Sequence, residues 1–385
     1  MLALLAMVST MRLFAEPLSP LELRKRLAAG AVTSVTAPEL EKYFGKAEEG
    51  SLRVDGVNIA WGVQRPDAKQ VRARFLDNSG EFDLKKIDGT DWFVGSFTVP
   101  HGTGTLWTVQ VDGRLIGDAR QIEAYLPDPD TKSHENVPKG KLIQMPKWTS
   151  KVYAGTTRDW WVYVPAQYKA DVPATTMIFN DGQWSRGYVP TVIDNLTAKG
   201  EIPPMIVILI APGGKTNDID NRSFEYDVLS DQYSKLLLDE IIPEVAKTYN
   251  LRTGAENRGI AGASSGGICA FTAAWERPDQ FSKVLSWIGS FVDLAKLHGK
   301  EQGGDDYPSL IRKNDAKPIR VFLQAGKNDL DNPFGNWPLA NLEMQKALAY
   351  KGYDATFVFG NGFHSDAQGR NTLPAAMRWL WRDVK

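Results

Sequence analysis

"RGIAGASSGGICAFTAAWE", residues Arg258 to Glu276, joins a short apolar run to a helix-like run through a cluster of small residues. Residues 262–266 fit the pattern G-x-S-x-G, with Ser264 at the centre. The pattern alone is weak evidence, but between a strand and a helix it matches a nucleophile elbow. There the serine occupies a strained turn of positive φ, and flanking glycines avoid clashes with the sheet and helix. The alternative is a glycine-rich turn without chemistry.

The surrounding sequence, residues 151–385, alternates apolar strand-like runs with helical patterns. The strand-like runs begin at residues 159, 174, 204, 258, 283, 319 and 354. Helical patterns such as "NWPLANLEMQKALAYKG" separate them, and "LPAAMRWLWRDV" closes the chain. Continuous apolar strands alternating with helices predict an α/β fold, a mostly parallel sheet covered on both faces by helices.

The part of the chain before this region has a different texture. Residues 17–48 carry apolar residues at helical spacing, whereas residues 49–127 contain short β-rich runs. We expect a helical segment followed by a small all-β, immunoglobulin-like (E-set-like) sandwich. Residues 128–150 are rich in Pro, Asp and Lys, and we interpret them as a linker.

Composition excludes several classes of function. The net charge is −1 with no basic run, which argues against a nucleic-acid partner. Four histidines lie far apart, so we expect no metal, and the lone Cys269 reads as a small core residue. No run is long enough to span a bilayer. Residues 1–16 resemble a weak signal peptide and favour a periplasmic or secreted protein, with a cytoplasmic location as the alternative.

A serine nucleophile needs a base and an acid, and α/β-hydrolases order them Ser, acid, His along the chain. His298 lies in a polar, surface-like stretch, whereas His364 follows the last strand-like run, where that fold places its base. The loop after "IRVFLQAG" offers Asp329 and Asp331 as the acid. Asp329 is favoured because it is nearer the strand end.

Two backbone N–H groups are candidates for an oxyanion hole. One is that of Ser265, at the start of the helix after the elbow, and the other is that of Gln183, in the turn after "TTMIFN". The side chains of Trp184, Arg222 and Trp337 are candidates for binding a substrate, and the alternatives are core packing for the tryptophans and an ion-pair network for Arg222.

The motifs "DGQW", "NRSFEYD", "AGASSGG", "AGKNDLDN" and "GFHS" occur in this order. Their order resembles that of the esterase D-like branch of α/β-hydrolases over about residues 151–385. That branch includes enterochelin (siderophore) esterases, feruloyl and acetyl-xylan esterases, S-formylglutathione hydrolases and mycolyltransferases. The resemblance implies Ser264 as nucleophile, His364 as base and Asp329 as acid, with the N–H groups of Gln183 and Ser265 as the oxyanion hole. Phe363 departs from the glycine that many relatives have.

We therefore expect a serine carboxylic-ester hydrolase that needs no cofactor and acts through an acyl-enzyme. Its substrate would be a small-molecule or polysaccharide ester, carrying acyl or feruloyl groups on carbohydrate. A siderophore esterase is an alternative, although no basic cluster for an anionic ferric substrate is evident. Two more alternatives are an acyltransferase and a non-catalytic binding protein on a hydrolase scaffold. The oligomeric state is open.

Overall fold

The structure, a computed structural model, describes residues 17–28, 35–214 and 221–384. The predicted signal peptide, residues 1–16, lies outside the described residues. The chain forms two compact units, one built from residues up to 101 with 105–124, the other from 102–104 with 125 onward. No helix in the described ranges is both long and apolar enough to cross a bilayer.

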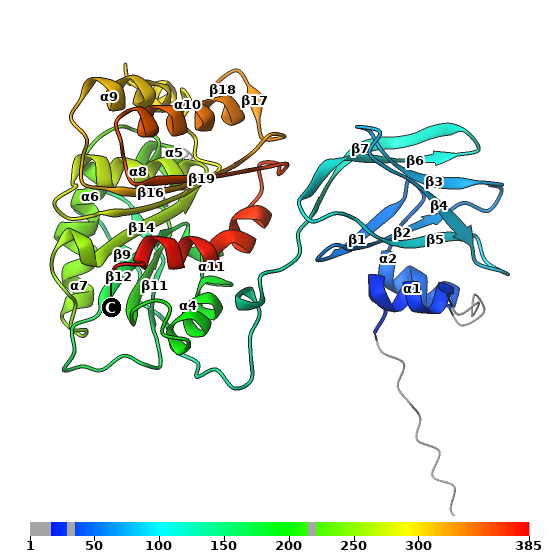
Figure 1. Cartoon of the computed structure of the whole chain (residues 1–385), viewed down its shortest axis with the longest axis horizontal. Coiled ribbons are helices and arrows are strands. Elements are labelled where there is room, and N and C mark those ends of the chain that lie inside the picture. The colour runs from blue at the N-terminus through cyan, green and yellow to red at the C-terminus, as the bar shows by residue number, and fades with distance from the viewer. Residues whose placement is uncertain (1–16, 29–34, 215–220, 385) are drawn as a thin grey trace, which may run out of the picture. The chain divides into compact units, whose positions relative to one another are not determined.

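The first unit combines two short helices with antiparallel strands (Figure 1). Its strand order is β1-β2-β5-β4-β3-β6-β7. Its elements are α1 (Pro20–Ala28), α2 (Ala37–Phe44), β1 (Ser51–Asp55), β2 (Asn58–Gln64), β3 (Val71–Phe75), β4 (Glu81–Lys86), β5 (Trp92–Thr98), β6 (Thr103–Val111) and β7 (Arg114–Ala124). Trp61, Trp92 and Trp107 are buried, as large aromatic side chains in a core should be. A unit built mainly of antiparallel strands is therefore observed, and the immunoglobulin-like assignment stays a prediction.

The second unit is built on an eight-stranded sheet of order β19-β16-β15-β14-β12-β13-β11-β8. The strands are β8 (Lys141–Gln144), β11 (Trp160–Val164), β12 (Thr175–Asn180), β13 (Met205–Ile210), β14 (Arg258–Ala263), β15 (Lys283–Trp287), β16 (Arg320–Gly326) and β19 (Ala355–Gly360). The pairings from β13 to β19 are parallel, whereas β11 and β8 pair antiparallel. This mostly parallel sheet confirms the α/β prediction.

Helices cover both faces of this sheet, and its strands are therefore buried on both sides. The helices α4 (Val189–Ala198) and α11 (Ala367–Trp381) pack on one face. The helices α8 (Ser265–Glu276), α9 (Tyr307–Lys313) and α10 (Trp337–Tyr350) pack on the other (Figure 1). Between β13 and β14 the chain forms one continuous helical stretch, made of α6 (Gln232–Lys235), η3 (Leu236–Ile241, π-helical) and α7 (Ile242–Ala246).

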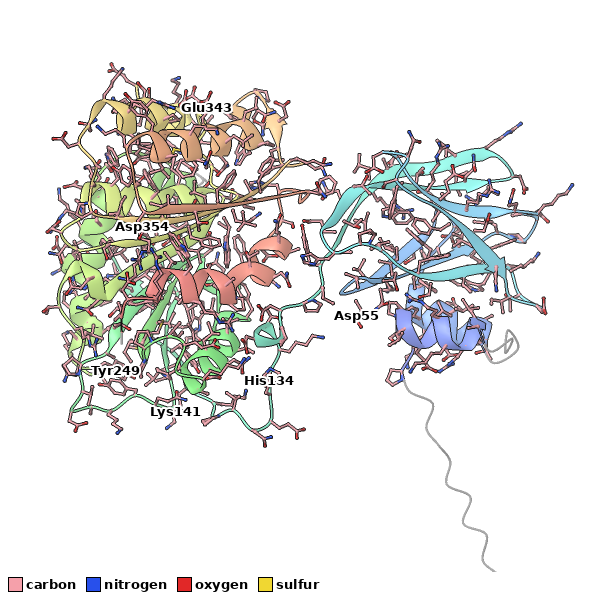
Figure 2. The ribbon with its side chains drawn as sticks, viewed as in Figure 1. Asp55, His134, Lys141, Tyr249, Glu343 and Asp354 are labelled. Atoms are coloured by element: carbon pink, nitrogen blue, oxygen red, sulfur yellow. The ribbon has the colours of Figure 1, made fainter. Side chains whose placement is uncertain are left out.

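Residues 128–150 are not a linker, and this expectation was wrong. They belong to the second unit and supply β8, which pairs with β11 at the edge of the large sheet. Lys141, at the start of that strand, is labelled in Figure 2. Asp130 is buried and pairs with Lys199 at 2.6 Å and with Arg378. The segment is polar and rich in Pro, so its composition did not indicate the edge strand or the ion pairs that hold it to the second unit.

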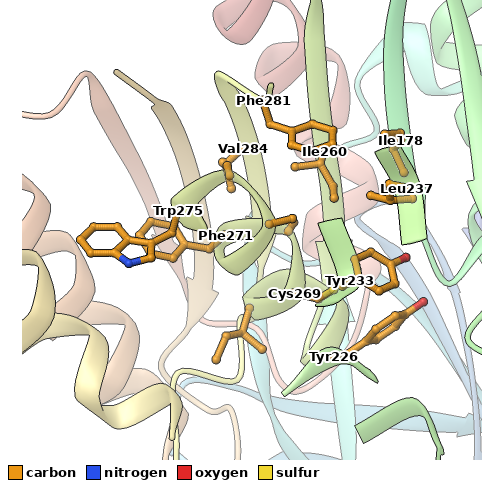
Figure 3. Packing of buried hydrophobic residues seen from close by; sticks show 14 of the residues in the cluster. Ile178, Tyr226, Tyr233, Leu237, Ile260, Cys269, Phe271, Trp275, Phe281 and Val284 are labelled. Atoms are coloured by element: carbon orange, nitrogen blue, oxygen red, sulfur yellow. The ribbon is translucent and has the colours of Figure 1, made fainter. Parts of the chain in front are cut away.

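The core under the elbow helix is tightly filled (Figure 3). Phe271 of α8 and Ile260 of β14 belong to one buried cluster that also contains Tyr226 and Tyr233. Cys269 lies in the same cluster with 1% of its surface exposed. Burial raises the pKa of its thiol well above the ordinary value, so this thiol stays protonated. The side chain acts as a small apolar residue.

Candidate active site

Ser264 lies at a sharp turn between β14 and α8, as the sequence predicts. Its φ of 58° and ψ of −125° are strained for a residue with a side chain. Gly262 is required here because a Cβ on it would lie 2.1 Å from the carbonyl oxygen of Gly266. The turn lifts the Ser264 side chain clear of the sheet, at the N-terminus of α8.

The hydroxyl of Ser264 lies in line with a histidine and a carboxylate. His364 Nε2 is 2.9 Å from Ser264 Oγ, and His364 Nδ1 is 2.5 Å from Asp329 Oδ1. His364 follows β19 and Asp329 follows β16, so both come from the carboxyl edge of the sheet. Asp331, the other candidate acid, is exposed in β17 (Asp331–Asn332). His298 contacts Ser223 Oγ instead.

The loop after β12 approaches the elbow from the other side. Asp181 has a left-handed backbone with φ of 54° and precedes α3 (Gly182–Ser185). A Cβ on Gly182 would lie 2.3 Å from the backbone of Leu209, so only glycine fits. The N–H groups of Gln183 and Ser265 lie in the first turns of α3 and α8. Neither has an acceptor within the described part of the chain, and both are available to a ligand.

Arg222 ties these two loops together. Its guanidinium, carried by α5 (Asn221–Tyr226), donates to both oxygens of Asp181 at 2.8 Å each. It also donates to the carbonyl of Ala263 at 3.3 Å, next to the nucleophile position. Burial lowers the pKa of Arg222, but the hydrogen bonds and charge of Asp181 outweigh burial and hold that pKa above the ordinary value. Arg222 is thus a fixed cation.

A cavity of about 280 Å³ opens in front of Ser264. Its walls combine aromatic and apolar side chains with polar and charged ones, a combination found in small-molecule sites. The residues that line it are Phe179, Asn180, Asp181, Trp184, Ser185, Tyr188, Arg222, Gly262, Ala263, Ser264, Trp287, Ile288, His364, Ser365 and Asp366. Trp184 is 59% exposed at this cavity, whereas Trp337 is buried and lies outside its walls.

Sequence reasoning missed Asn180, which lies at the end of β12. Its amide donates to the carbonyl of Gly266 at 2.9 Å and accepts from the Tyr233 hydroxyl at 2.7 Å. These bonds fix the start of α8 against the neighbouring strand. The position of Asn180 at the end of a strand was the only local feature of the sequence that pointed to the site.

In the described ranges, no group of three or more His, Cys, Asp or Glu residues is placed to hold a metal ion.

A doubly covered, mostly parallel sheet with a strained serine turn, a histidine and a carboxylate at its carboxyl edge defines an α/β-hydrolase-like protein. Comparison with known proteins agrees. The chain belongs to the family described as "Putative esterase", whose model matches residues 152–380.

Two curated proteins are similar to this chain in sequence. It is 26% identical over 316 residues to an endo-1,4-beta-xylanase/feruloyl esterase of Xylanibacter ruminicola, covering 75% of this chain and 40% of that protein. It is 25% identical over 231 residues to an iron(III) enterobactin esterase of Dickeya dadantii, covering 57% and 51%. The chain therefore matches only about half, or less, of the length of these relatives.

Solved structures share the fold. The enterobactin esterase of Shigella flexneri superposes with a TM-score of 0.59 at 18% identity, covering 91% of this chain and 100% of that one. A ferulic acid esterase superposes with a TM-score of 0.53 at 20% identity, covering 64% and 99%. At these sequence identities the similarity shows a shared fold and nothing further.

Proposed function

We propose that the protein is a serine carboxylic-ester hydrolase that works through an acyl-enzyme. One observation carries the proposal: the continuous line of hydrogen-bonding contacts from Ser264 through His364 to Asp329. Membership of an esterase family supports the reaction class. A serine hydroxyl is a poor nucleophile until an adjacent base accepts its proton, and His364 Nε2 is within reach of that proton.

In the first half-reaction, Ser264 Oγ forms a bond to the ester carbonyl carbon while its proton passes to His364. The tetrahedral intermediate collapses, the bond to the alcohol oxygen breaks, and His364 returns the proton to the departing alcohol. In the second half-reaction, water gives a proton to His364 and attacks the acyl carbon. The acid is released and Ser264 regains its proton.

Two further parts of the site have roles in this cycle. Asp329 accepts the Nδ1–H of His364, which leaves Nε2 free to act as base and stabilises the imidazolium. The N–H groups of Gln183 and Ser265 are the proposed donors to the oxyanion, and each such donor is worth roughly 3 kcal/mol in acyl transfer.

The substrate we propose is an acyl or feruloyl ester of a carbohydrate. Phe179, Tyr188 and Trp287 make the cavity wall suited to an aromatic or other apolar acyl group. Trp184, half exposed at the same cavity, is placed to stack on a ring of the acyl group or the sugar. The feruloyl esterase named among the relatives supports this substrate class.

The second candidate is a siderophore esterase, which the enterobactin esterases among the relatives favour. The charges around the cavity weigh against it. Arg222 is the one Lys or Arg among the lining residues, and it is paired with Asp181. Asp366 adds a second carboxylate to the same lining. An anionic ferric ligand would therefore find little positive charge.

Hydrolysis of methyl ferulate and of a short p-nitrophenyl ester, measured for the wild type and Ser264→Ala, tests the proposal. We expect turnover by the wild type and a fall of roughly four to six orders of magnitude in the variant.

Ferric enterobactin as a third substrate separates the two candidates. A second product formed with an added acceptor alcohol would indicate acyl transfer. Equal activity of both proteins would refute the mechanism.

A further inference from the structure

A second serine lies next to the proposed nucleophile. Ser290 Oγ is 3.2 Å from Ser264 Oγ, and Ser290 is completely buried. On its other side, the indole Nε1–H of Trp337 donates to Ser290 Oγ at 3.2 Å. Trp337 also places its ring edge-on to His364, with the ring centres 5.8 Å apart. A buried network of Ser290 and Trp337 thus reaches the reacting oxygen in addition to the histidine.

The chemistry of the groups fixes the direction of each hydrogen bond. An indole N–H only donates, so Ser290 Oγ accepts from Trp337 and its own proton is free to point elsewhere. Ser264 must donate to His364 Nε2 for the base to act, because Nδ1 donates to Asp329. The Ser290 hydroxyl therefore donates to Ser264 Oγ.

We propose that Ser290 is a further catalytic residue, which donates a hydrogen bond to Ser264 Oγ, and that Trp337 is a positioning residue that holds Ser290 in this orientation. The inference rests on the proposed function. As the proton leaves Ser264, negative charge grows on Oγ, and a donor already in place stabilises it. The same bond stabilises Oγ when it becomes the leaving group in the second half-reaction.

The backbone around Ser290 is built to hold this position. Ser290 N–H donates to the carbonyl of Ser264 at 3.1 Å, so the two serines are joined by main chain as well as side chain. The buried amide of Asn341 donates to the carbonyls of Gly289 at 2.9 Å and Trp337 at 3.0 Å. Ile288 has a φ of 41°, a strained conformation for a β-branched residue. Such strain is typical of functional sites, where the surrounding structure enforces it.

The rate of covalent labelling by a fluorophosphonate tests the proposal without any knowledge of the substrate. In that reaction Ser264 Oγ binds phosphorus, fluoride leaves, and His364 accepts the proton. We expect Ser290→Ala to slow labelling about tenfold, the value of one hydrogen bond of about 1.4 kcal/mol. The pH midpoint of labelling should not move, because the pair of His364 and Asp329 is untouched.

Ser286→Ala is the matched control. Ser286, in β15, is completely buried, and its Oγ has no hydrogen-bond partner within the described residues. The substitution removes the same hydroxyl from a neighbouring site and should leave the labelling rate unchanged. If it slowed labelling as much as Ser290→Ala does, the effect would be one of packing, and the proposal would be wrong.

Trp337→Phe provides an independent test, because it keeps the ring beside His364 and removes only the donor. Ser290 then becomes free to accept from Ser264 and to compete with His364, so labelling should slow about threefold, the value of a weak hydrogen bond. In the Ser290→Ala background the same change should have no further effect. Equal slowing in both backgrounds would assign Trp337 to packing and overturn the proposal. An unchanged rate in Trp337→Phe alone would also overturn it, even if Ser290→Ala did not fold.

The wild type separates this inference from the proposed function. If the wild type is not labelled at Ser264, the proposed function fails. If it is labelled, and Ser290→Ala is labelled at the same rate, only the role of Ser290 fails.

Discussion

The guanidinium of Arg222 binds both carboxylate oxygens of Asp181 at 2.8 Å, across 41 residues of sequence. Asp181 begins the loop that carries one proposed oxyanion donor, and the third bond of Arg222, to Ala263, reaches the turn that carries the other. Arginine is suited to this bidentate contact, because its planar guanidinium presents two N–H groups side by side to the two carboxylate oxygens. The spacing between the two donors therefore depends on Arg222.

Arg222→Lys should lower kcat for ester hydrolysis by about tenfold or more, with a smaller change in KM. Lysine keeps the charge but makes only a single point contact, so the loops of Asp181 and Ala263 are no longer held at a fixed separation. The proposed oxyanion donors then lose their alignment. Steady-state kinetics measures both constants. Arg312→Lys, at an exposed position on α9, is the control and should behave as wild type. A rise in KM alone would instead assign Arg222 to substrate binding.

Asp329→Asn should reduce kcat by about four orders of magnitude, because an amide in its place favours the wrong tautomer of His364. Asp331→Asn, on the exposed strand β17, should leave kcat within about twofold of the wild type, since surface changes are usually near neutral. The two variants, assayed in parallel, decide between the two acids that the sequence left open. The reverse ranking would reassign the acid to Asp331.

Lys283 lies buried at the opposite end of the sheet, with its ammonium 4.8 Å from the ring centre of Trp381. The pKa of Lys283 is lowered from 10.5 to about 8, mainly by burial and secondly by the positive charge of Arg320. Asp354, labelled in Figure 2, pairs with Arg320 at 2.6 Å in the same region. The charged form of Lys283 is therefore disfavoured in the folded protein and not in the unfolded chain.

Lys283→Met should consequently change how stability depends on pH. Between about pH 8 and 10.5 the unfolded chain binds the proton of Lys283 and the folded chain does not, so this group makes the free energy of unfolding rise with pH. The difference between wild type and variant should shift in favour of the wild type across this window. Urea unfolding at several pH values measures it. A constant difference would show that the pKa of Lys283 is not lowered.

The elbow was predictable because its pattern is local: a strand, G-x-S-x-G and a helix follow one another directly. His364 and Asp329 could be placed because parallel strands bring their carboxyl ends to one edge of the sheet. Ser290 could not, because its contact with Ser264 arises from a strained turn after β15 that leaves no pattern in the sequence. The strand β8 was missed because an edge strand need not be apolar, and its composition resembles that of a linker.

The burial of Cys269 has a practical consequence. The chain carries no other cysteine, and this one is enclosed under the elbow helix with its thiol protonated. A cysteine introduced in place of the exposed Trp184 would then be the one thiol that a maleimide reaches in the folded protein. A fluorophore or spin label could be set at the rim of the cavity in a single step, without first removing native thiols. The protein thereby lends itself to watching ligand entry directly.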